Sequence, residues 1–342
     1  MTVDAVVEAK SAGLHYVSDA KPGIRREKFR GKFRYVKPDG STVRNEGDHE
    51  RIAHLAIPPA YEDVWISTDP LGHIQATGRD ARGRKQYRYH ERWREVRDAA
   101  KYERLVEFAD ALPAMRTSLE RDLSLRGMPK EKVLAGVVTL LEATLIRVGN
   151  EEYARDNQSF GLTTLRNRHA CVRGASLRFE FKGKSGLHHR VDLHDRKLAQ
   201  LVALCQDLPG QHLFSYLDDD GNAVPIDSSD VNAYIREISG ADFTAKDFRT
   251  WLGTVHCAQW LLEHPAETEA ERSKNAAEAV KFTASQLRNT PAVCRKCYIH
   301  PAVFERYLET GKLAVRKSRR KSQLHPEERF AVDLLRYSRK DT

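Results

Sequence analysis

Residues 176–193 read Ser176-Leu177-Arg178-Phe179-Glu180-Phe181-Lys182-Gly183-Lys184-Ser185-Gly186-Leu187-His188-His189-Arg190-Val191-Asp192-Leu193. The runs 176–181 and 188–193 read as strands, and the glycine-bounded turn at 183–186 joins them into a predicted β-hairpin. A further strand is expected at 162–165. Together these runs predict a small three-stranded sheet.

Helical patterns lie on both sides of this sheet in the sequence. Leu105, Phe108 and Leu112 recur at helical spacing and mark one helix, and Pro129 opens the next. The apolar face of that second helix is expected to carry Val133, Val137, Leu140, Leu141 and Val148. After residue 193 the pattern is helical to the end of the chain.

The first ninety or so residues have a different pattern, of short strands and turns. Strands are expected at 31–36, 62–67 and 73–77, with turn signals at Pro38-Asp39-Gly40, which separates two strand runs, and at 69–72. These features predict a small antiparallel sheet with short helical pieces.

The two patterns together predict an α+β fold with two domains. A β-rich N-terminal domain is expected at 1–91, and a larger, mainly helical domain that contains the three-stranded sheet is expected at 92–342. The change from strand to helix pattern places a hinge near Glu91–Arg97.

Composition favours an anionic partner. Of the 342 residues, 57 are Lys or Arg and 48 are Asp or Glu, which gives a net charge of +9. The basic residues are interleaved with aromatics and glycines, and this favours nucleic acid over a membrane surface. No apolar run approaches the roughly 20 residues of a membrane span. The first residues lack the pattern of a signal peptide, so an intracellular, cytoplasmic protein is expected.

The five cysteines are too few, too scattered and odd in number for a disulfide framework. Cys294 and Cys297 have the spacing of a metal-binding pair. No second pair of cysteines or histidines accompanies them at ligand spacing, so free thiols and no metal site are expected.

Four residues spread along the chain could together cleave a phosphodiester. Tyr298 can attack phosphorus and hold it covalently. Arg147 and Arg249 can stabilise the charged phosphorane, since guanidinium groups bind phosphate oxygens in pairs of hydrogen bonds. Lys184 can protonate the departing hydroxyl, whereas arginine, with a pKa above about 12, is a poor proton donor.

Each of these residues also has a plainer explanation when taken alone. Arg147 could form a structural ion pair, and Lys184 could be a solvated turn lysine. Arg249 could form an exposed surface pair with Lys246, three residues earlier in a helix that a Thr244/Asp247 capping box is expected to open. Tyr298 could be an ordinary core tyrosine in a helix that begins at Thr290-Pro291.

The order and context of these residues resemble the type IB DNA topoisomerases of the compact poxvirus and bacterial kind. The resemblance runs from about residue 50 to 310 and is carried by the segments 83–89, 145–149, 157–165, 181–184, 246–250 and 289–298. It implies the topoisomerase IB and tyrosine recombinase-like fold. It also implies an ATP-independent isomerase that relaxes supercoiled duplex DNA through a 3′-phosphotyrosyl intermediate, strand rotation and religation.

The resemblance further assigns residues. It implies a catalytic set of Tyr298, Arg147, Lys184, Arg249 and Asn289. It implies DNA contacts from Arg84, Lys85, Gln86, Tyr87, Tyr89, Tyr153 and Lys246. No cofactor, metal or nucleotide is expected, and the enzyme is expected to be a monomer that clamps duplex DNA in the cytoplasm, on the nucleoid in a bacterium.

One position departs from the family pattern. The family usually has histidine where this chain has Asn289, nine residues before the tyrosine. That histidine donates a hydrogen bond to a nonbridging phosphate oxygen. The amide of an asparagine can also donate, although it carries no charge and transfers no proton.

Two alternatives have different sequence signatures. A tyrosine recombinase or integrase would use the same transesterification chemistry, but such enzymes usually place histidine three residues before the second arginine, where this chain has Lys246. A non-catalytic DNA-binding protein would share the basic composition, yet it offers no reason for the tyrosine and its accompanying cations.

Overall fold

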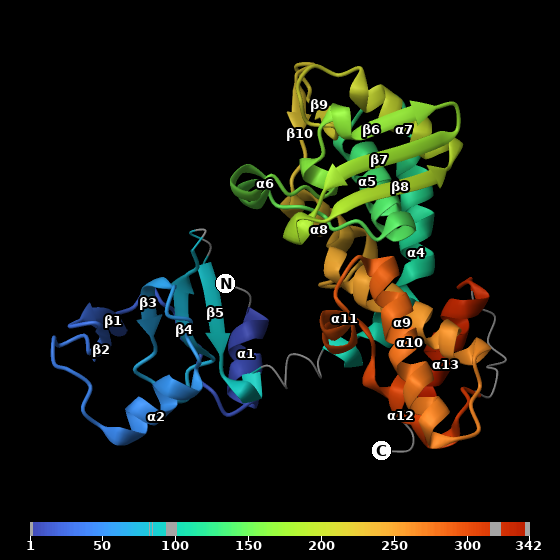
Figure 1. The fold of residues 1–342 in the computed structure, drawn as a ribbon. Coiled ribbons are helices and arrows are strands. Elements are labelled where there is room, and N and C mark those ends of the chain that lie inside the picture. Colours follow the sequence, from blue (N-terminus) through green and yellow to red (C-terminus); the bar gives the residue numbers. More distant parts are fainter. Residues whose placement is uncertain (1–2, 82, 84, 94–100, 315–322, 339–342) are drawn as a thin grey trace. The chain divides into compact units, whose positions relative to one another are not determined.

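The computed structural model describes residues 3–81, 83, 85–93, 101–314 and 323–338. The chain divides into two compact units, Met1–Glu103 and Arg104–Thr342, which are the N-terminal and C-terminal units (Figure 1). The predicted boundary between residues 91 and 92 falls before this division and remains a prediction. Most of the predicted hinge at Glu91–Arg97 lies outside the described residues.

The N-terminal unit contains an antiparallel sheet with the strand order β2-β1-β3-β4-β5. Its strands are β1 (Ile24–Phe29), β2 (Lys32–Val36), β3 (Glu62–Ile66), β4 (Ile74–Arg79) and β5 (Lys85–Tyr89). The sheet and three of its strands were predicted, whereas β1 and β5 were not. β1 lacks a strand pattern in the sequence because it is rich in charged residues and buries only Ile24.

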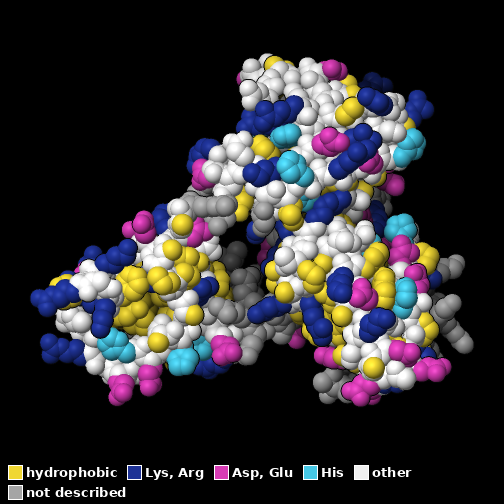
Figure 2. Space-filling view, in the orientation of Figure 1, with side chains coloured by type: hydrophobic (Ala, Val, Ile, Leu, Met, Phe, Trp, Pro, Cys, Tyr) yellow, Lys and Arg dark blue, Asp and Glu magenta, His cyan; other side chains and the backbone are white. Residues whose placement is uncertain are grey.

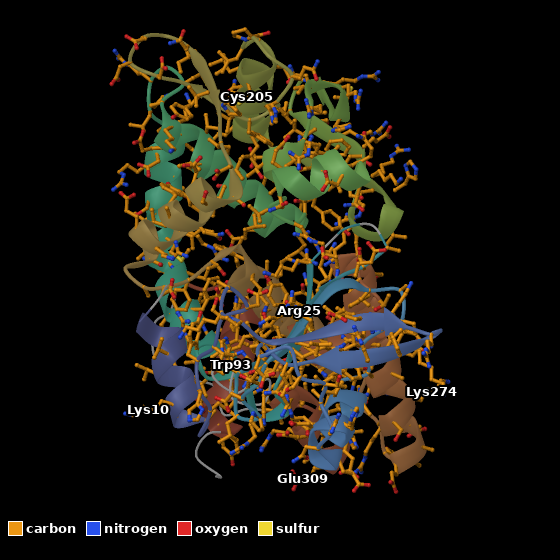
Figure 3. The ribbon with its side chains drawn as sticks, turned by 90° about the vertical axis from the view of Figure 1, so that its left-hand side faces the viewer. Lys10, Arg25, Trp93, Cys205, Lys274 and Glu309 are labelled. Atoms are coloured by element: carbon orange, nitrogen blue, oxygen red, sulfur yellow. The ribbon has the colours of Figure 1, made fainter. Side chains whose placement is uncertain are left out.

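One predicted strand run in this unit is wrong. The run after Pro38-Asp39-Gly40 forms no strand, and it contributes a single bridge between Val36 and Thr42. The short helices are α1 (Val3–Ser11) and α2 (Glu46–His54). The core of the sheet packs against Ile52 of α2, while Trp93 packs with Ala9 and Leu14 near α1 (Figure 3).

The C-terminal unit is mainly helical. Its helices are α4 (Leu105–Leu123), α5 (Lys130–Thr144), α6 (Glu151–Asn157), α7 (Arg196–Gln206), α8 (Ser228–Ser239), α9 (Ala245–Glu263), α10 (Glu269–Leu287), α11 (Pro291–Tyr298), α12 (Pro301–Thr310) and α13 (Pro326–Ser338). Among the helices of the described residues, none is long and apolar enough to cross a membrane.

The three-stranded sheet of this unit has the order β6-β7-β8. Its strands are β6 (Ala170–Arg173), β7 (Ser176–Lys182) and β8 (His188–His194). The predicted hairpin is confirmed, but the strand expected at 162–165 is wrong. That segment is the short 3-10 helix η1 (Leu162–Thr164), because its amides bond to the loop after α5 and the Thr164 hydroxyl bonds to Gly161.

Two other expectations for this unit are corrected. The region after residue 193 is not entirely helical, since β9 (Ser215–Leu217) and β10 (Ala223–Pro225) form a hairpin. The second predicted helix ends at Thr144 and does not reach Val148, because Leu145 adopts a left-handed conformation with φ of 56°. The chain therefore leaves α5 before it reaches Arg147.

A partly buried network of ion pairs and one hydrogen bond joins four helices of this unit. Arg116 of α4 contacts Glu142 of α5 at 2.5 Å and Glu328 of α13 at 2.7 Å. The indole of Trp251, in α9, donates to the same Glu328 carboxylate at 3.3 Å. Since buried charges are stable only when paired, this network holds α9 in a defined position.

Candidate active site

Arg147 lies in the loop after α5, and close backbone packing holds this loop in place. A Cβ atom on Gly161 would lie 2.5 Å from the Arg147 carbonyl oxygen, so a side chain has no room there. The Leu162 amide donates to that oxygen at 2.9 Å, and the Thr163 amide donates to Val148 at 2.7 Å. The half-buried Arg147 side chain therefore starts from a well-defined backbone.

Arg249 lies in the second turn of α9, and only 4% of it is exposed. The predicted Thr244/Asp247 capping box opens this helix. The guanidinium donates to the carbonyls of Leu145 and Leu287, the latter at 2.7 Å. These two residues lie at the ends of α5 and α10, where carbonyls have no partner within the helix. Arg249 is thus not part of an exposed surface pair.

The end of α10 brings a further arginine to the same place. Arg288 has a left-handed backbone with φ of 51°, a conformation that usually favours glycine at the end of a helix. Its guanidinium donates to the carbonyl of Thr144 at 3.0 Å, next to the carbonyl that Arg249 binds. Two cations therefore occupy the negative ends of helix dipoles.

Asn289 follows directly and connects α10 to the Arg147 loop. Its side-chain oxygen accepts a hydrogen bond from the Arg147 guanidinium at 2.5 Å. The helix that follows, α11, is capped by Thr290, whose hydroxyl accepts from the Val293 amide at 3.4 Å. The Asn289 side chain is thus directed to Arg147 and leaves the helix cap to Thr290.

Tyr298 ends α11 and packs on α9. A Cβ atom on Gly253 would lie 2.6 Å from the Tyr298 carbonyl oxygen, so the glycine allows the two helices to approach closely. The Thr254 hydroxyl donates to the same oxygen at 3.4 Å. The guanidinium carbon of Arg249 lies 5.2 Å from the centre of the half-buried Tyr298 ring.

Lys184 lies in the turn of the β7–β8 hairpin, at the start of the short helix η3 (Lys184–Gly186). The Phe160 amide donates to the Lys182 carbonyl at 2.8 Å, which ties the hairpin to the segment that packs on the Arg147 loop. Lys184 is exposed, and within the described part of the chain no hydrogen bond or ion pair restrains its ammonium group. The backbone beside the turn is thus anchored, and the Lys184 side chain is exposed to solvent.

The electrostatics of the site are strongly positive. Across the described ranges, no carboxylate forms an ion pair with Arg147, Arg249 or Arg288. Burial lowers the pKa of Arg249, and the charge of Arg147 lowers it further. Burial also lowers the pKa of Arg288. Because guanidinium groups stay protonated even so, the site holds three uncompensated positive charges and favours an anion.

Several buried nitrogens at this site also lack a partner. They are two donors, Nε of Arg249 and the side-chain nitrogen Nδ2 of Asn289, and both ring nitrogens of His189 in β8, of which one donates and one accepts in the neutral imidazole. Buried polar groups in native proteins are nearly always hydrogen-bonded, so a cluster of unpartnered ones is typical of a site that binds a ligand. The arrangement suits a phosphate group, which presents several acceptor oxygens and a negative charge.

Comparison with known families bears directly on these residues. Residues 90–324 match the family model of the catalytic core of eukaryotic DNA topoisomerase I, and residues 32–80 match that of the N-terminal domain of bacterial DNA topoisomerase IB. The chain belongs to the type IB DNA topoisomerase family. The first match spans all five residues of the predicted catalytic set.

Individual relatives agree with this family. DNA topoisomerase 1B of Acanthamoeba polyphaga mimivirus is 36% identical over 293 residues, which cover 83% of this chain and 87% of the viral protein. DNA topoisomerase 1B of vaccinia virus (strain Copenhagen) is 23% identical over 268 residues, which cover 75% of this chain and 81% of the viral protein. The predicted similarity to compact viral and bacterial topoisomerases is confirmed, and it favours this family over the recombinase alternative.

The predicted DNA-contact residues of this topoisomerase are divided between its two units. Lys85, Gln86, Tyr87 and Tyr89 lie on β5 of the N-terminal unit, whereas Arg84 lies outside the described residues. Tyr87 is exposed and stacks with Tyr89 at a ring separation of 5.8 Å. Lys85 is exposed but forms an ion pair with Asp19 at 2.6 Å. A DNA phosphate that bound Lys85 would take the place of the Asp19 carboxylate.

The other two predicted contacts belong to the C-terminal unit. Tyr153 is half-buried on α6, and Lys246 is exposed in the first turn of α9. A run of basic residues in the sequence, Arg316-Lys317-Ser318-Arg319-Arg320-Lys321, lies outside the described residues. Lys and Arg side chains are spread over the visible face of both units of the topoisomerase (Figure 2).

The five cysteines all lie among the described residues and form no disulfide. Cys205, which is labelled in Figure 3, is buried in α7, and burial raises its pKa to about 12. Within the described residues, no group of three or more His, Cys, Asp or Glu side chains could hold a metal ion.

Two site residues of this topoisomerase were not predicted from its sequence. Arg288 directly precedes Asn289, and its position beside the 289–298 segment is its one signal in the sequence. His189 lies in the hairpin at 176–193, but its neighbour His188 carries the same side chain and is exposed. The alternation of side chains along a strand distinguishes the two histidines, because His189 lies on the same face as Val191 and opposite Phe181 of the paired strand.

Proposed function

We propose that this topoisomerase cleaves one strand of duplex DNA by attack of the Tyr298 oxygen on a backbone phosphate. A bond forms between the phenolic oxygen and phosphorus as the phenolic proton passes to solvent. The bond from phosphorus to the 5′ oxygen breaks, and the released strand carries a 5′-hydroxyl. Rotation of that strand about the intact one relaxes supercoils, and attack by the 5′-hydroxyl regenerates Tyr298. The observation that carries the proposal is the unpaired cluster of cations and donors beside Tyr298.

The arginines are proposed to stabilise the phosphorane that forms during attack. Arg147 is held by a packed loop and by Asn289, and Arg249 is held by two backbone carbonyls. Their donors are positioned before the substrate binds, so little reorganisation is needed when negative charge develops on phosphorus. Arg288 adds a third positive charge to the same region.

Lys184 is proposed to protonate the departing 5′ oxygen. Its ammonium carries a transferable proton, whereas the guanidinium groups hold theirs too tightly. Its place on an anchored turn, with an exposed side chain, suits a group that must reach the substrate. In religation the same amine would accept the proton of the 5′-hydroxyl.

Asn289 is proposed to donate a hydrogen bond to a nonbridging phosphate oxygen. Its Oδ1 is occupied by Arg147, which orients the amide so that the unpartnered Nδ2 remains available. The side chain would therefore both position an arginine and contact the phosphate.

Replacement of Asn289 is expected to slow the chemical step and leave DNA affinity nearly unchanged. Asn289→Ala should cleave prebound duplex roughly twofold to tenfold more slowly, because a neutral hydrogen bond contributes about 0.5–1.5 kcal/mol. Asn289→His should retain activity, since an imidazole N–H can donate to the same oxygen. Single-turnover cleavage measures the effect.

Asn289→Asp separates the two contacts of this side chain. The aspartate keeps an acceptor for Arg147 but replaces the donor with a negative charge, so it should slow cleavage more than alanine does. If cleavage by Asn289→Ala is unchanged while its thermal stability falls, the residue has only a structural role.

DNA contacts outside the cleavage site are proposed for β5 and for α6 and α9. The exposed Tyr87 and Lys85 of β5 offer aromatic and basic groups, and Lys246 offers a cation near the start of α9. With the two units on one chain, a monomer could hold duplex DNA as a clamp.

Relaxation of a supercoiled plasmid tests the proposed reaction class. The wild-type protein should relax the plasmid in a buffer that contains a chelator and no ATP, since the energy of the broken phosphodiester is kept in the tyrosyl linkage. Gel electrophoresis would show topoisomers of intermediate linking number. A protein that binds the plasmid but leaves it supercoiled under these conditions would contradict the proposal.

A further inference from the structure

His189 is a buried histidine that the proposed reaction does not yet use. It lies in β8, opposite Phe181 of β7, and only 7% of it is exposed. Its ring stacks on that of Phe181, with 5.0 Å between centres and an angle of 12°. Neither ring nitrogen has a hydrogen-bond partner. A structural histidine at this degree of burial would normally have both nitrogens satisfied.

The surroundings of His189 are those of the phosphate site. Burial lowers its pKa to about 4, and the charges of Arg288, Arg147 and Arg249 contribute to this shift together with His188. The main chain also joins the two regions, because the Phe160 amide donates to the Lys182 carbonyl at 2.8 Å and Gly161 packs on the Arg147 carbonyl. The imidazole is neutral near pH 7, so it carries one N–H donor that has no acceptor in the protein.

His189 also contacts the turn that carries Lys184. A Cβ atom on Gly183 would lie 2.3 Å from Nε2 of His189, so the imidazole occupies the space that a side chain at 183 would need. The ring is thus held between the Phe181 ring and the Gly183 backbone. A side chain fixed in this way loses little conformational entropy when it binds a ligand.

We propose that His189 is a further catalytic residue, whose imidazole N–H donates to a nonbridging oxygen of the phosphate that Tyr298 attacks. This inference rests on the proposed function. It gives the site an imidazole donor, although this chain has Asn289 where the family usually has histidine. It also explains why a buried histidine lies unpartnered near the arginines. No atom is transferred in this step, because the imidazole acts only as a donor.

Single-turnover cleavage of prebound duplex tests the proposal. His189→Phe keeps a ring of similar shape against Phe181 but has no donor. It should cleave about tenfold to a hundredfold more slowly, as expected for loss of a hydrogen bond to a charged group. His189→Leu should show a similar loss, and His189→Gln, which restores an N–H, should recover part of the rate. His188→Phe, at the adjacent exposed position, is the matched control and should cleave at the wild-type rate.

Two modified substrates distinguish phosphate contact from an effect on the lysine turn. A 5′-thiol leaving group needs no proton, so it should restore cleavage by Lys184→Ala but not by His189→Phe. A methylphosphonate replaces one nonbridging oxygen with a methyl group. In the stereoisomer that lacks the oxygen bound by His189, wild-type and His189→Phe rates should converge.

The outcomes separate this inference from the function on which it rests. If the wild-type protein forms no covalent adduct with DNA, the proposed function itself fails. If the wild type cleaves and both His189→Phe and His189→Leu cleave equally fast, only the role of His189 fails. Rescue of His189→Phe by the thiol, or a rate difference that persists in both methylphosphonate isomers, would also overturn it.

Discussion

Tyr298→Phe is expected to abolish relaxation of supercoiled DNA while duplex binding persists. The substitution removes one oxygen and keeps the ring that lies 5.2 Å from Arg249. Without the nucleophile no covalent intermediate can form, and loss of a nucleophile in other enzymes lowers the rate by about 10⁶. Denaturant-trapped adducts on end-labelled duplex should be absent, whereas binding measured by mobility shift should match the wild type.

A second tyrosine provides the control for this experiment. Tyr337 in α13 is 40% exposed and carries the same phenol outside the anion site, so Tyr337→Phe should relax DNA normally. Residual adduct formation by Tyr298→Phe would show that another residue is the nucleophile, and the proposed mechanism would then be wrong.

The arginines and the lysine should respond differently to the leaving group. Arg147→Ala or Arg249→Ala removes charge stabilisation of the phosphorane and should slow cleavage by about 10² to 10³. Lys184→Ala removes the proton donor and should slow it by about 10² to 10⁴. A 5′-thiol leaving group should restore much of the rate of Lys184→Ala and little of the rate of either arginine variant.

Thermal unfolding should distinguish variants that lose only activity from those that also lose stability. Arg249→Ala leaves the carbonyls of Leu145 and Leu287 without their donor, so it should also lower stability. Arg147 is only half-buried and Lys184 is exposed, so their alanine variants should unfold near the wild-type temperature. If the thiol rescues Arg147→Ala and not Lys184→Ala, the assigned roles are reversed.

Some features of the fold could be predicted because they depend on local sequence. The hairpin around Gly183–Gly186, the capping box at Thr244 and the helix start at Thr290-Pro291 follow from turn and cap chemistry that acts over a few residues. The errors arose where long-range packing outweighed local pattern. Residues 162–165 resemble a strand, but they bond to the Arg147 loop and form a 3-10 helix instead.

The candidate site shows the same division. The sequence by itself determined the family, the order of the motifs and the identity of the tyrosine, lysine and arginines, because each motif is contiguous in the chain. Only the tertiary structure decided how they are paired. Arg147 and Asn289 are 142 positions apart, and their hydrogen bond exists because the end of α10 packs against the loop after α5.

Burial was likewise decided by tertiary structure. Sequence alone could not separate a solvated arginine from Arg249, which is enclosed by the ends of two helices, or separate His188 from the unpartnered His189. Desolvation and the proximity of like charges depend on which distant segments meet, and these effects make the site favour an anion. The residue types came from the sequence, while their electrostatic state came from the fold.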